Sequence, residues 1–233
     1  MLEDKPVYNL ITETNRVLGI AVDGKLADNM PPREMVDSLR HDVFVFSACK
    51  THVQLKELSG YLLGEDGKPS SWSEFRSAAK GIYQTYNESY LEAEYVFATS
   101  SAQMAAKWAD VSKDGDRYNL QYRTAADDRV RNSHRIMHGT TLPSGDDFWN
   151  SYYPPNGWRC RCTVIQVIKD KYPQSNSQEK IIEADQATTE LDSQGRDRNA
   201  MFRFNPGKQK VIFPPNHPYY KVKEAPAVKN VTR

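Results

Sequence analysis

The sequence predicts an α+β fold with an N-terminal helical region that contains a long helix, followed by a small β-rich module and a C-terminal hairpin extension. Apolar residues recur every three or four positions through much of residues 31–110, which is the period of an amphipathic helix. Residues 117–123 and 160–165 are typical of short strands, and turn-forming Pro, Gly and Asn residues lie between them. These observations divide the chain into an arm (1–30), a helical region (31–112), a core module (113–170) and an extension (171–233).

The overall composition narrows the class of protein. The chain has 233 residues with 31 basic and 30 acidic side chains, so a net charge of +1 gives no general attraction to nucleic acid. The sequence lacks an apolar run of about 18 residues and a basic-then-apolar N-terminus, so we expect neither a membrane partner nor a signal peptide. Three cysteines make no disulfide framework, which favours a reducing compartment.

The first sixty residues begin with the arm. Asp23-Gly24 is a dipeptide typical of hairpin turns, so a short hairpin within the arm is one alternative and a mobile arm that packs on a partner is the other. Pro31 and Pro32 suit the entry to a helix, and a helical period continues to residue 63. The run Val-Phe-Val-Phe at 43–46 leaves a strand open as an alternative.

The long helix is predicted to begin near Ser71. Ser71 and Glu74 fit the capping-box pattern, in which side chain and backbone satisfy each other at a helix start. An apolar stripe follows and reaches toward Asp110, with a break expected near residues 99–101. Its tyrosines favour a role as scaffold or interface over stacking on bases.

The core module is predicted to combine two strands, a short helix and a rigid turn. Residues 117–123 form the first strand, and Asp127 or Asp128 caps a helix that Gly139 ends. The turn at residues 154–158, Pro-Pro-Asn-Gly-Trp, leads into the strand that starts at Cys160. Because side chains two apart on a strand point the same way, the sulfurs of Cys160 and Cys162 should face one side.

The extension is predicted to hold a polar helix and a hairpin. The helix covers residues 178–191. Residues 201–204 and 210–213 are strand-like, and the turn at 205–208 would join them into a hairpin added to the central sheet. An extended aromatic segment and a tail follow.

Four side chains of the core module make a candidate zinc site. His134 and His138 are four residues apart on the predicted helix and therefore share a face. With Cys160 and Cys162 they supply four ligands of the type that a closed, structural zinc site uses. If His138 stays out, a position opens for water and hydrolysis becomes conceivable. The alternative is a metal-free site in which His134 hydrogen-bonds across the strand and the cysteines are buried small residues.

The module is also locally basic, with arginines at 123, 129, 131, 135, 159 and 161 and aspartates at 127, 128, 146 and 147. One interpretation is an internal ion-pair network that holds the loops. The other is contact with phosphate or an acidic partner. The residues predicted to bind a partner are Arg129, Arg131, Trp149, Trp158 and Arg161.

These residues carry a resemblance. The run from Tyr122 to Cys162 is similar to the signature of the phage Mu protein F-like minor head proteins, also called phage head morphogenesis proteins. The matching positions are Asp127, Arg129, Val130, Arg131 and His134, then Gly139, Asp146, Asp147, Phe148 and Trp149, and finally residues 154–158 with Cys160, Arg161 and Cys162. Asp127, not Asp128, matches when the spacing is counted strictly, and His138 lies at a position that the pattern leaves variable.

The resemblance implies a viral structural protein present in few copies per head. It implies portal and capsid proteins as partners, a place in the capsid interior or at the portal vertex, and the host cytoplasm during assembly. Contact with packaged DNA during packaging or ejection belongs to the same expectation. No small-molecule substrate is indicated.

A structural protein is the preferred reading over an enzyme. The sequence holds no H-E-x-x-H, P-loop, nucleophile-elbow or dinucleotide motif, and no residue is assigned a catalytic role. The alternative is a metal-dependent nuclease or other phosphate-acting hydrolase with His134 as base and Arg131 or Arg161 on phosphate. A DNA-binding accessory protein is a third reading, which the near-neutral charge does not favour.

Overall fold

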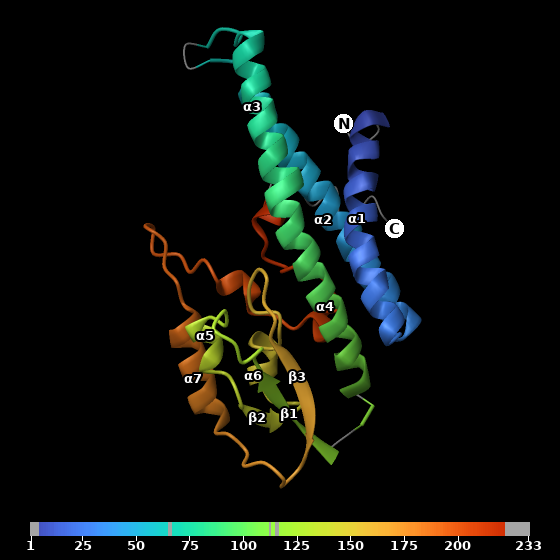
Figure 1. The fold of residues 1–233 in the computed structure, drawn as a ribbon, viewed down its shortest axis with the longest axis vertical. Helices are drawn as coiled ribbons and strands as arrows, with labels where there is room; N and C mark the ends of the chain where they lie inside the picture. The colour runs from blue at the N-terminus through green and yellow to red at the C-terminus, as the bar shows by residue number, and fades with distance from the viewer. Residues whose placement is uncertain (1–4, 65–66, 112, 115–116, 222–233) are drawn as a thin grey trace.

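The computed structural model describes residues 5–64, 67–111, 113–114 and 117–221, and Figure 1 shows a group of long helices beside a small mixed unit. The predicted α+β class is confirmed. None of the described helices has the length and apolar character needed to cross a membrane. The long helical elements are α1 (Lys5–Asp28), α2 (Arg33–Gly60), α3 (Trp72–Gln84), the π-helix η1 (Thr85–Tyr90) and α4 (Leu91–Val111).

Helix α1 corrects the prediction of a hairpin within the arm. Leu18, Val22 and Leu26 recur every four residues on one helix face and are at most 1% exposed, because α1 packs against α2 and α4. This burial outweighs the local turn preference of Asp23-Gly24, which lies inside the helix. The strand alternative at residues 43–46 is likewise wrong, because α2 runs through it without interruption.

Helices α3 and α4 join through η1 into one long helical run (Figure 1). The predicted capping box at its start is confirmed, since Ser71 accepts from the Glu74 backbone N–H and the Glu74 carboxylate accepts from the Ser71 N–H. The irregularity lies at Thr85–Tyr90 rather than at residues 99–101, which are regular α4. Small residues of α4, Ala98, Ala102 and Ala105, are fully buried, and such side chains let neighbouring helices approach closely.

The mixed unit is built on an antiparallel sheet with the order β2–β1–β3. Strand β1 (Tyr118–Arg123) pairs with β2 (Thr141–Pro143) and β3 (Thr163–Ile168), placing Leu120 opposite Leu142 and Gln166. The first predicted strand is confirmed, but the second begins at Thr163, so Cys160 and Cys162 precede it. Three helices complete the unit: α5 (Asn132–Arg135), α6 (Phe148–Ser151) and α7 (Ser177–Thr188).

The predicted C-terminal hairpin is wrong. Its two segments instead form or flank the 3-10 helix η3 (Ala200–Phe202), the short helix α8 (Pro206–Gln209) and the 3-10 helix η4 (Pro218–Lys221). The aromatic residues that made the sequence strand-like are buried on the helices rather than in the sheet. The Phe213 ring stacks on Phe46 of α2 with 3.6 Å between centroids, and Phe202 and Phe204 lie beside Phe97 of α4. The extension therefore covers the helical core.

Candidate metal centre

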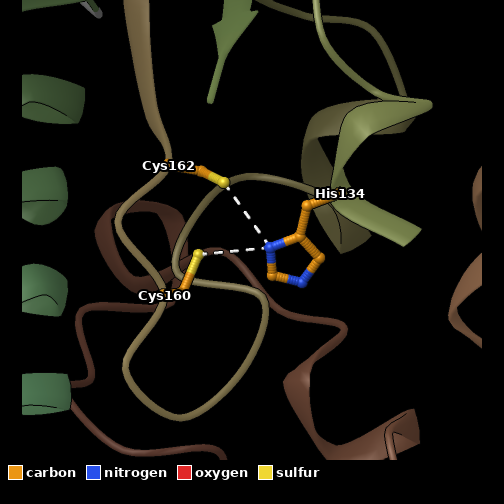
Figure 2. Close-up of side chains that lie close together, drawn as sticks. All are labelled: His134, Cys160 and Cys162. Atoms are coloured by element: carbon orange, nitrogen blue, oxygen red, sulfur yellow. Dashed lines mark hydrogen bonds between the residues drawn. The ribbon is translucent and has the colours of Figure 1, made fainter. Parts of the chain in front are cut away.

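Three predicted ligands meet in the mixed unit. His134 lies on α5, and Cys160 and Cys162 lie in the chain that leads into β3 (Figure 2). The His134 Nδ1 is 3.7 Å from the Cys160 sulfur and 3.5 Å from the Cys162 sulfur. All three side chains are buried, with exposures of 4%, 3% and 8%, and their ligand atoms lie within 4.8 Å of one another. His134 is far from the two cysteines in the sequence, so the fold brings these residues together.

These distances fit a tetrahedral metal ion. Zinc binds sulfur at about 2.3 Å and imidazole nitrogen at about 2.0–2.1 Å. A sulfur and a nitrogen that bind the same zinc at a tetrahedral angle therefore lie about 3.6 Å apart. The two sulfur–nitrogen distances, 3.5 and 3.7 Å, fall on either side of that value. A ligand set of one imidazole and two thiolates is the soft donor chemistry that zinc prefers.

The pKa values of the two thiols are shifted in opposite directions. The hydrogen bond from Cys162 lowers the pKa of Cys160 well below its usual value, and His134 acts in the same direction. The neighbouring Cys160 and then burial raise the pKa of Cys162. A divalent cation removes this conflict, because it stabilises both thiolates at once.

A set of polar contacts holds the ligands in place. The Arg131 guanidinium donates to the Trp158 carbonyl oxygen at 2.6 Å, joining the start of α5 to the turn before Cys160. A Cβ on Gly157 would lie 3.3 Å from that guanidinium, so glycine gives Arg131 room. The Tyr122 hydroxyl of β1 donates to Asn156 Oδ1 at 2.9 Å and fixes the same turn to the sheet.

His138 is not part of this centre, which corrects the prediction of four ligands. Helix α5 spans only Asn132–Arg135, so His138 does not share its face with His134. Gly139 follows with φ +82°, and the His138 Nδ1 lies 2.8 Å from the Thr124 hydroxyl. Among the described residues the group consists of His134, Cys160 and Cys162.

The predicted helix cap at Asp127 or Asp128 is also wrong, since Arg131 takes the N-cap position. Asp127 instead binds Arg161 in a two-pronged ion pair, with oxygen–nitrogen distances of 2.6 and 2.7 Å. The Arg161 hydrogen bonds lower the pKa of Asp127 to about 2. Arg161 therefore agrees with the interpretation of the local charges as an internal ion-pair network. Its side chain joins the Asp127 loop to the segment between the cysteines.

The two tryptophans predicted to bind a partner have different positions. Trp149 is 0% exposed, and its indole N–H donates to the Pro143 carbonyl at 2.9 Å, so it is a core residue and not a contact surface. Trp158 is half-buried, and its ring packs against Phe97 and Phe202 of the helical core. The predicted arginines, Arg129, Arg131 and Arg161, are all exposed.

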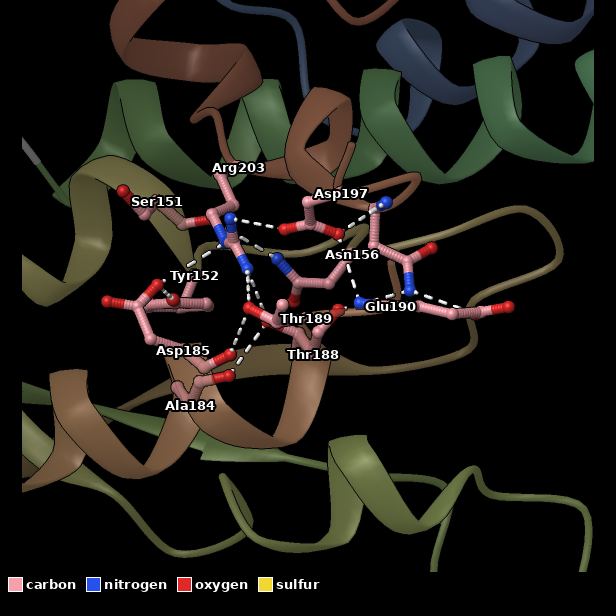
Figure 3. Close-up of polar contacts among 11 residues, drawn as sticks. Ser151, Tyr152, Asn156, Ala184, Asp185, Thr188, Thr189, Glu190, Asp197 and Arg203 are labelled. Carbon is pink, nitrogen blue, oxygen red and sulfur yellow. Dashed lines mark hydrogen bonds and ion pairs between the residues drawn. The ribbon is translucent and has the colours of Figure 1, made fainter. Parts of the chain in front are cut away.

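Sequence reasoning missed a polar network around Arg203 (Figure 3). This side chain pairs with Asp197 at 2.7 Å and Asp185 at 3.4 Å, and donates to the Thr189 hydroxyl at 3.0 Å. It thereby fastens the segment around residues 197–203 to the end of α7, beside a cleft of about 350 Å³ that His134 also lines. The segment around Arg203 carries only a strand-like pattern, and such a pattern does not indicate this role.

The candidate metal centre lies in the part of the chain that matches a known protein family. A family model described as Phage Mu protein F like protein matches residues 68–165, which include all three ligands. The Putative capsid assembly protein F of Escherichia phage Mu is 38% identical over 71 residues, covering 30% of this chain and 16% of that protein. The Mu-like prophage FluMu F protein of Haemophilus influenzae is 37% identical over 65 residues, covering 28% and 16%. The chain thus matches only a small part of these relatives, and no solved structure matches it. The predicted resemblance is confirmed.

Proposed function

We propose that this chain takes part in the assembly of a phage head, because residues 68–165 match the family model described as Phage Mu protein F like protein. One relative carries the name of a capsid assembly protein, which supports this role over that of an enzyme. The proposed partners are capsid and portal proteins, and the proposed place is the capsid interior or the portal vertex. A part in DNA packaging or ejection belongs to the same proposal.

The proposed role of the metal centre is to hold the mixed unit in one conformation. The observation that carries this step is the pair of sulfur–nitrogen distances, 3.5 and 3.7 Å, which fit tetrahedral zinc. The ligands join α5 to the chain ahead of β3, across a unit whose strands and helices are short. An assembly protein needs a fixed surface for its partner, and a buried metal supplies that rigidity.

The assembly role is tested by following the chain in infected cells. A tagged copy should sediment with heads or proheads and co-purify with the portal or capsid protein. Cys162→Ser should reduce that association, because the mixed unit loses a ligand. Cys49→Ser is the matched control, since Cys49 is equally buried but lies on α2 outside the group. Recovery of the tagged chain only in the free cytosolic pool would contradict the proposal.

A further inference from the structure

A small cavity lies directly against the three ligands. Its volume is about 20 Å³, enough for one ion or one water molecule. Beyond His134, Cys160 and Cys162 it is lined mainly by arginine residues, and among the described lining residues there is no Asp or Glu. The arginines are Arg129, Arg131, Arg159 and Arg161, which we call the arginine rim.

The protein supplies three ligands where tetrahedral zinc takes four. No fourth His, Cys, Asp or Glu of the described residues joins the group. Sites with three protein ligands leave one coordination position for water or for a bound molecule. Two thiolates already neutralise a divalent cation, and the four arginines of the rim contact only two carboxylates of the described residues, Asp127 and Glu92, so the charge that remains here is positive.

The four arginines of the rim divide into two pairs. Arg131 and Arg161 are anchored, the first to the Trp158 carbonyl and the second to Asp127. Arg129 and Arg159 have side chains that are 77% and 57% exposed, and their carboxylate contacts are looser, at 3.6 Å to Asp127 and 3.3 Å to Glu92. This second pair is therefore available to a ligand at the rim.

The backbone at Arg159 supports this division. Arg159 has φ +57°, a left-handed conformation that is unfavourable for a residue with a side chain. Its neighbours, Trp158 and Cys160, both point inward, to the helical core and to the metal group. The left-handed residue keeps its own guanidinium exposed between two inward-facing side chains.

We infer that the arginine rim binds a phosphate group, one oxygen of which fills the fourth coordination position of the metal. This inference rests on the proposed metal centre. Guanidinium groups pair with phosphate through parallel hydrogen bonds. A tetrahedral phosphate has enough oxygens to contact the metal and both Arg129 and Arg159, whereas a carboxylate has only two. Free phosphate and a phosphate of a nucleic acid share this chemistry.

The test uses the full chain loaded with Co²⁺ in place of zinc. Cobalt bound by two thiolates shows a charge-transfer absorption, and its visible bands change when the fourth ligand changes. Millimolar inorganic phosphate, compared with sodium chloride at equal ionic strength, should change the visible bands. Arg129→Gln and Arg159→Gln should each weaken phosphate binding about tenfold, because each loses a hydrogen bond to a charged group. Arg76→Gln, an exposed arginine of α3, is the matched control and should bind as the parent does.

Two further arms identify the source of the phosphate. An oligonucleotide with a 5′-phosphate and the same oligonucleotide without it are added separately. A spectral change from the phosphorylated strand alone supports a terminal phosphate, and equal changes support internal phosphodiesters. A change with inorganic phosphate alone supports the free anion.

The outcomes separate the two proposals. If cobalt gives no thiolate charge-transfer band, the metal centre itself is wrong. If the band is present but neither phosphate nor oligonucleotide alters the spectrum, the phosphate inference is overturned while the metal centre stands. Equal phosphate affinity in Arg129→Gln, Arg159→Gln and the parent would also overturn it, because the rim would then not hold the ligand.

Discussion

The helical core and the mixed unit are held together in different ways. The helical core consists of long helices whose apolar faces meet, and the C-terminal extension covers it with aromatic rings. The mixed unit has three strands of three to six residues and two helices of only four, α5 and α6. Short elements bury little apolar surface each. The apolar core of the unit therefore depends on large buried rings, such as those of Tyr122, Phe148 and Trp149, and Cys160 and Cys162 are part of that core.

The turn at residues 154–158 joins the two regions. Trp158 leaves this turn for the helical core, where its ring lies 4.9 Å from that of Phe97, while Cys160 turns to the metal group of the mixed unit. Tyr153 also reaches α4, donating to the Met104 carbonyl at 3.1 Å. The comparison therefore teaches that one short segment sets the position of the unit with the candidate metal centre on the helical scaffold.

Metal removal is expected to have the largest effect, and it should change the stability of the mixed unit but not that of the helical core. Structural zinc contributes about 10–16 kcal/mol in small metal-dependent domains, which is as large as the net stability of an ordinary domain. A chelator should therefore abolish hydrogen-exchange protection in residues 118–168 and leave α2 protected. The measurement is hydrogen exchange read by mass spectrometry, together with metal content, expected at about one equivalent.

Single variants provide the controls for metal removal. Cys162→Ser should reproduce the effect of the chelator, and Cys49→Ser should keep both the metal and the protection of the mixed unit. Identical exchange in residues 118–168 with and without chelator would show that this region needs no metal, and the contrast drawn between the two regions would fail.

The sequence predicted the locally determined features correctly and failed where the structure depends on tertiary packing. Helix α2, the capping box at Ser71 and strand β1 were predicted correctly, because each depends on a local period or a local hydrogen bond. The segments that failed depend on tertiary burial. Asp23-Gly24 has the preference of a turn but lies on a helix that the core requires, and Phe204 and Phe213 have the preference of strands but bury on helices.

The candidate site shows the same limit. His134, Cys160 and Cys162 lie together as their residue types indicated, and metal binding by this group stays a prediction. His138 failed because the prediction assumed a helix of several turns, whereas α5 is one turn long. The network of Arg203 could not be predicted, because its partners come from segments whose arrangement depends on the whole fold.

The second largest effect is expected at the buried ion pair of the helical core. Lys50 of α2 and Glu94 of α4 pair with side-chain exposures of 1% and 4%, and the Tyr219 hydroxyl also donates to Glu94. Burial lowers the pKa of Lys50 and raises the pKa of Glu94, so each charge depends on the other. Lys50→Met should lower the free energy of unfolding by about 3–5 kcal/mol, measured by urea denaturation.

The controls for this pair test whether the charge or the packing matters. Adding Glu94→Leu to Lys50→Met should recover most of the loss, since a buried pair is often replaceable by apolar residues. Arg16→Met breaks the exposed pair with Glu13 on α1 and should leave the free energy of unfolding nearly unchanged, because solvent screens that pair. A loss in Lys50→Met no larger than in Arg16→Met would contradict the expectation.

Alanine substitution at two glycines tests how closely the chain is packed at each position. A Cβ on Gly207 of α8 would lie 2.2 Å from the Trp108 Cβ, so Gly207→Ala should destabilise the protein by about 1–3 kcal/mol through overpacking. Gly81 of α3 has no atom within 4 Å of the added carbon, so Gly81→Ala should instead stabilise by about 0.5–1 kcal/mol. Both changes are measured as shifts in urea denaturation, and the same sign for both would count against the close α8–α4 contact.

A pH dependence is expected in the helical core, and near neutral pH its effect on stability is small. His217 is 6% exposed beside Phe46, and its Nδ1 accepts the Tyr219 backbone N–H at 3.2 Å. Burial, then the charges of Lys50 and Lys221, lowers its pKa to about 3. Protonation would also remove the acceptor that the Tyr219 N–H uses, so the folded state holds this ring neutral.

The sign of the pH effect follows from the depressed pKa. The unfolded chain binds a proton at His217 below about pH 6.5, and the folded chain does not until about pH 3. Stability from this residue is therefore complete above pH 6.5 and falls by up to about 1.4 kcal/mol per pH unit below it. His217→Phe should flatten the decline of the unfolding free energy between neutral pH and pH ~5 relative to the parent. In the parent, hydrogen-exchange protection of α2 should decline with the unfolding free energy as the pH falls. Acid loss of metal from the mixed unit depends on the cysteines and should not change in the variant. If α2 of His217→Phe still lost protection in parallel with the mixed unit, His217 would not be the source of the pH dependence.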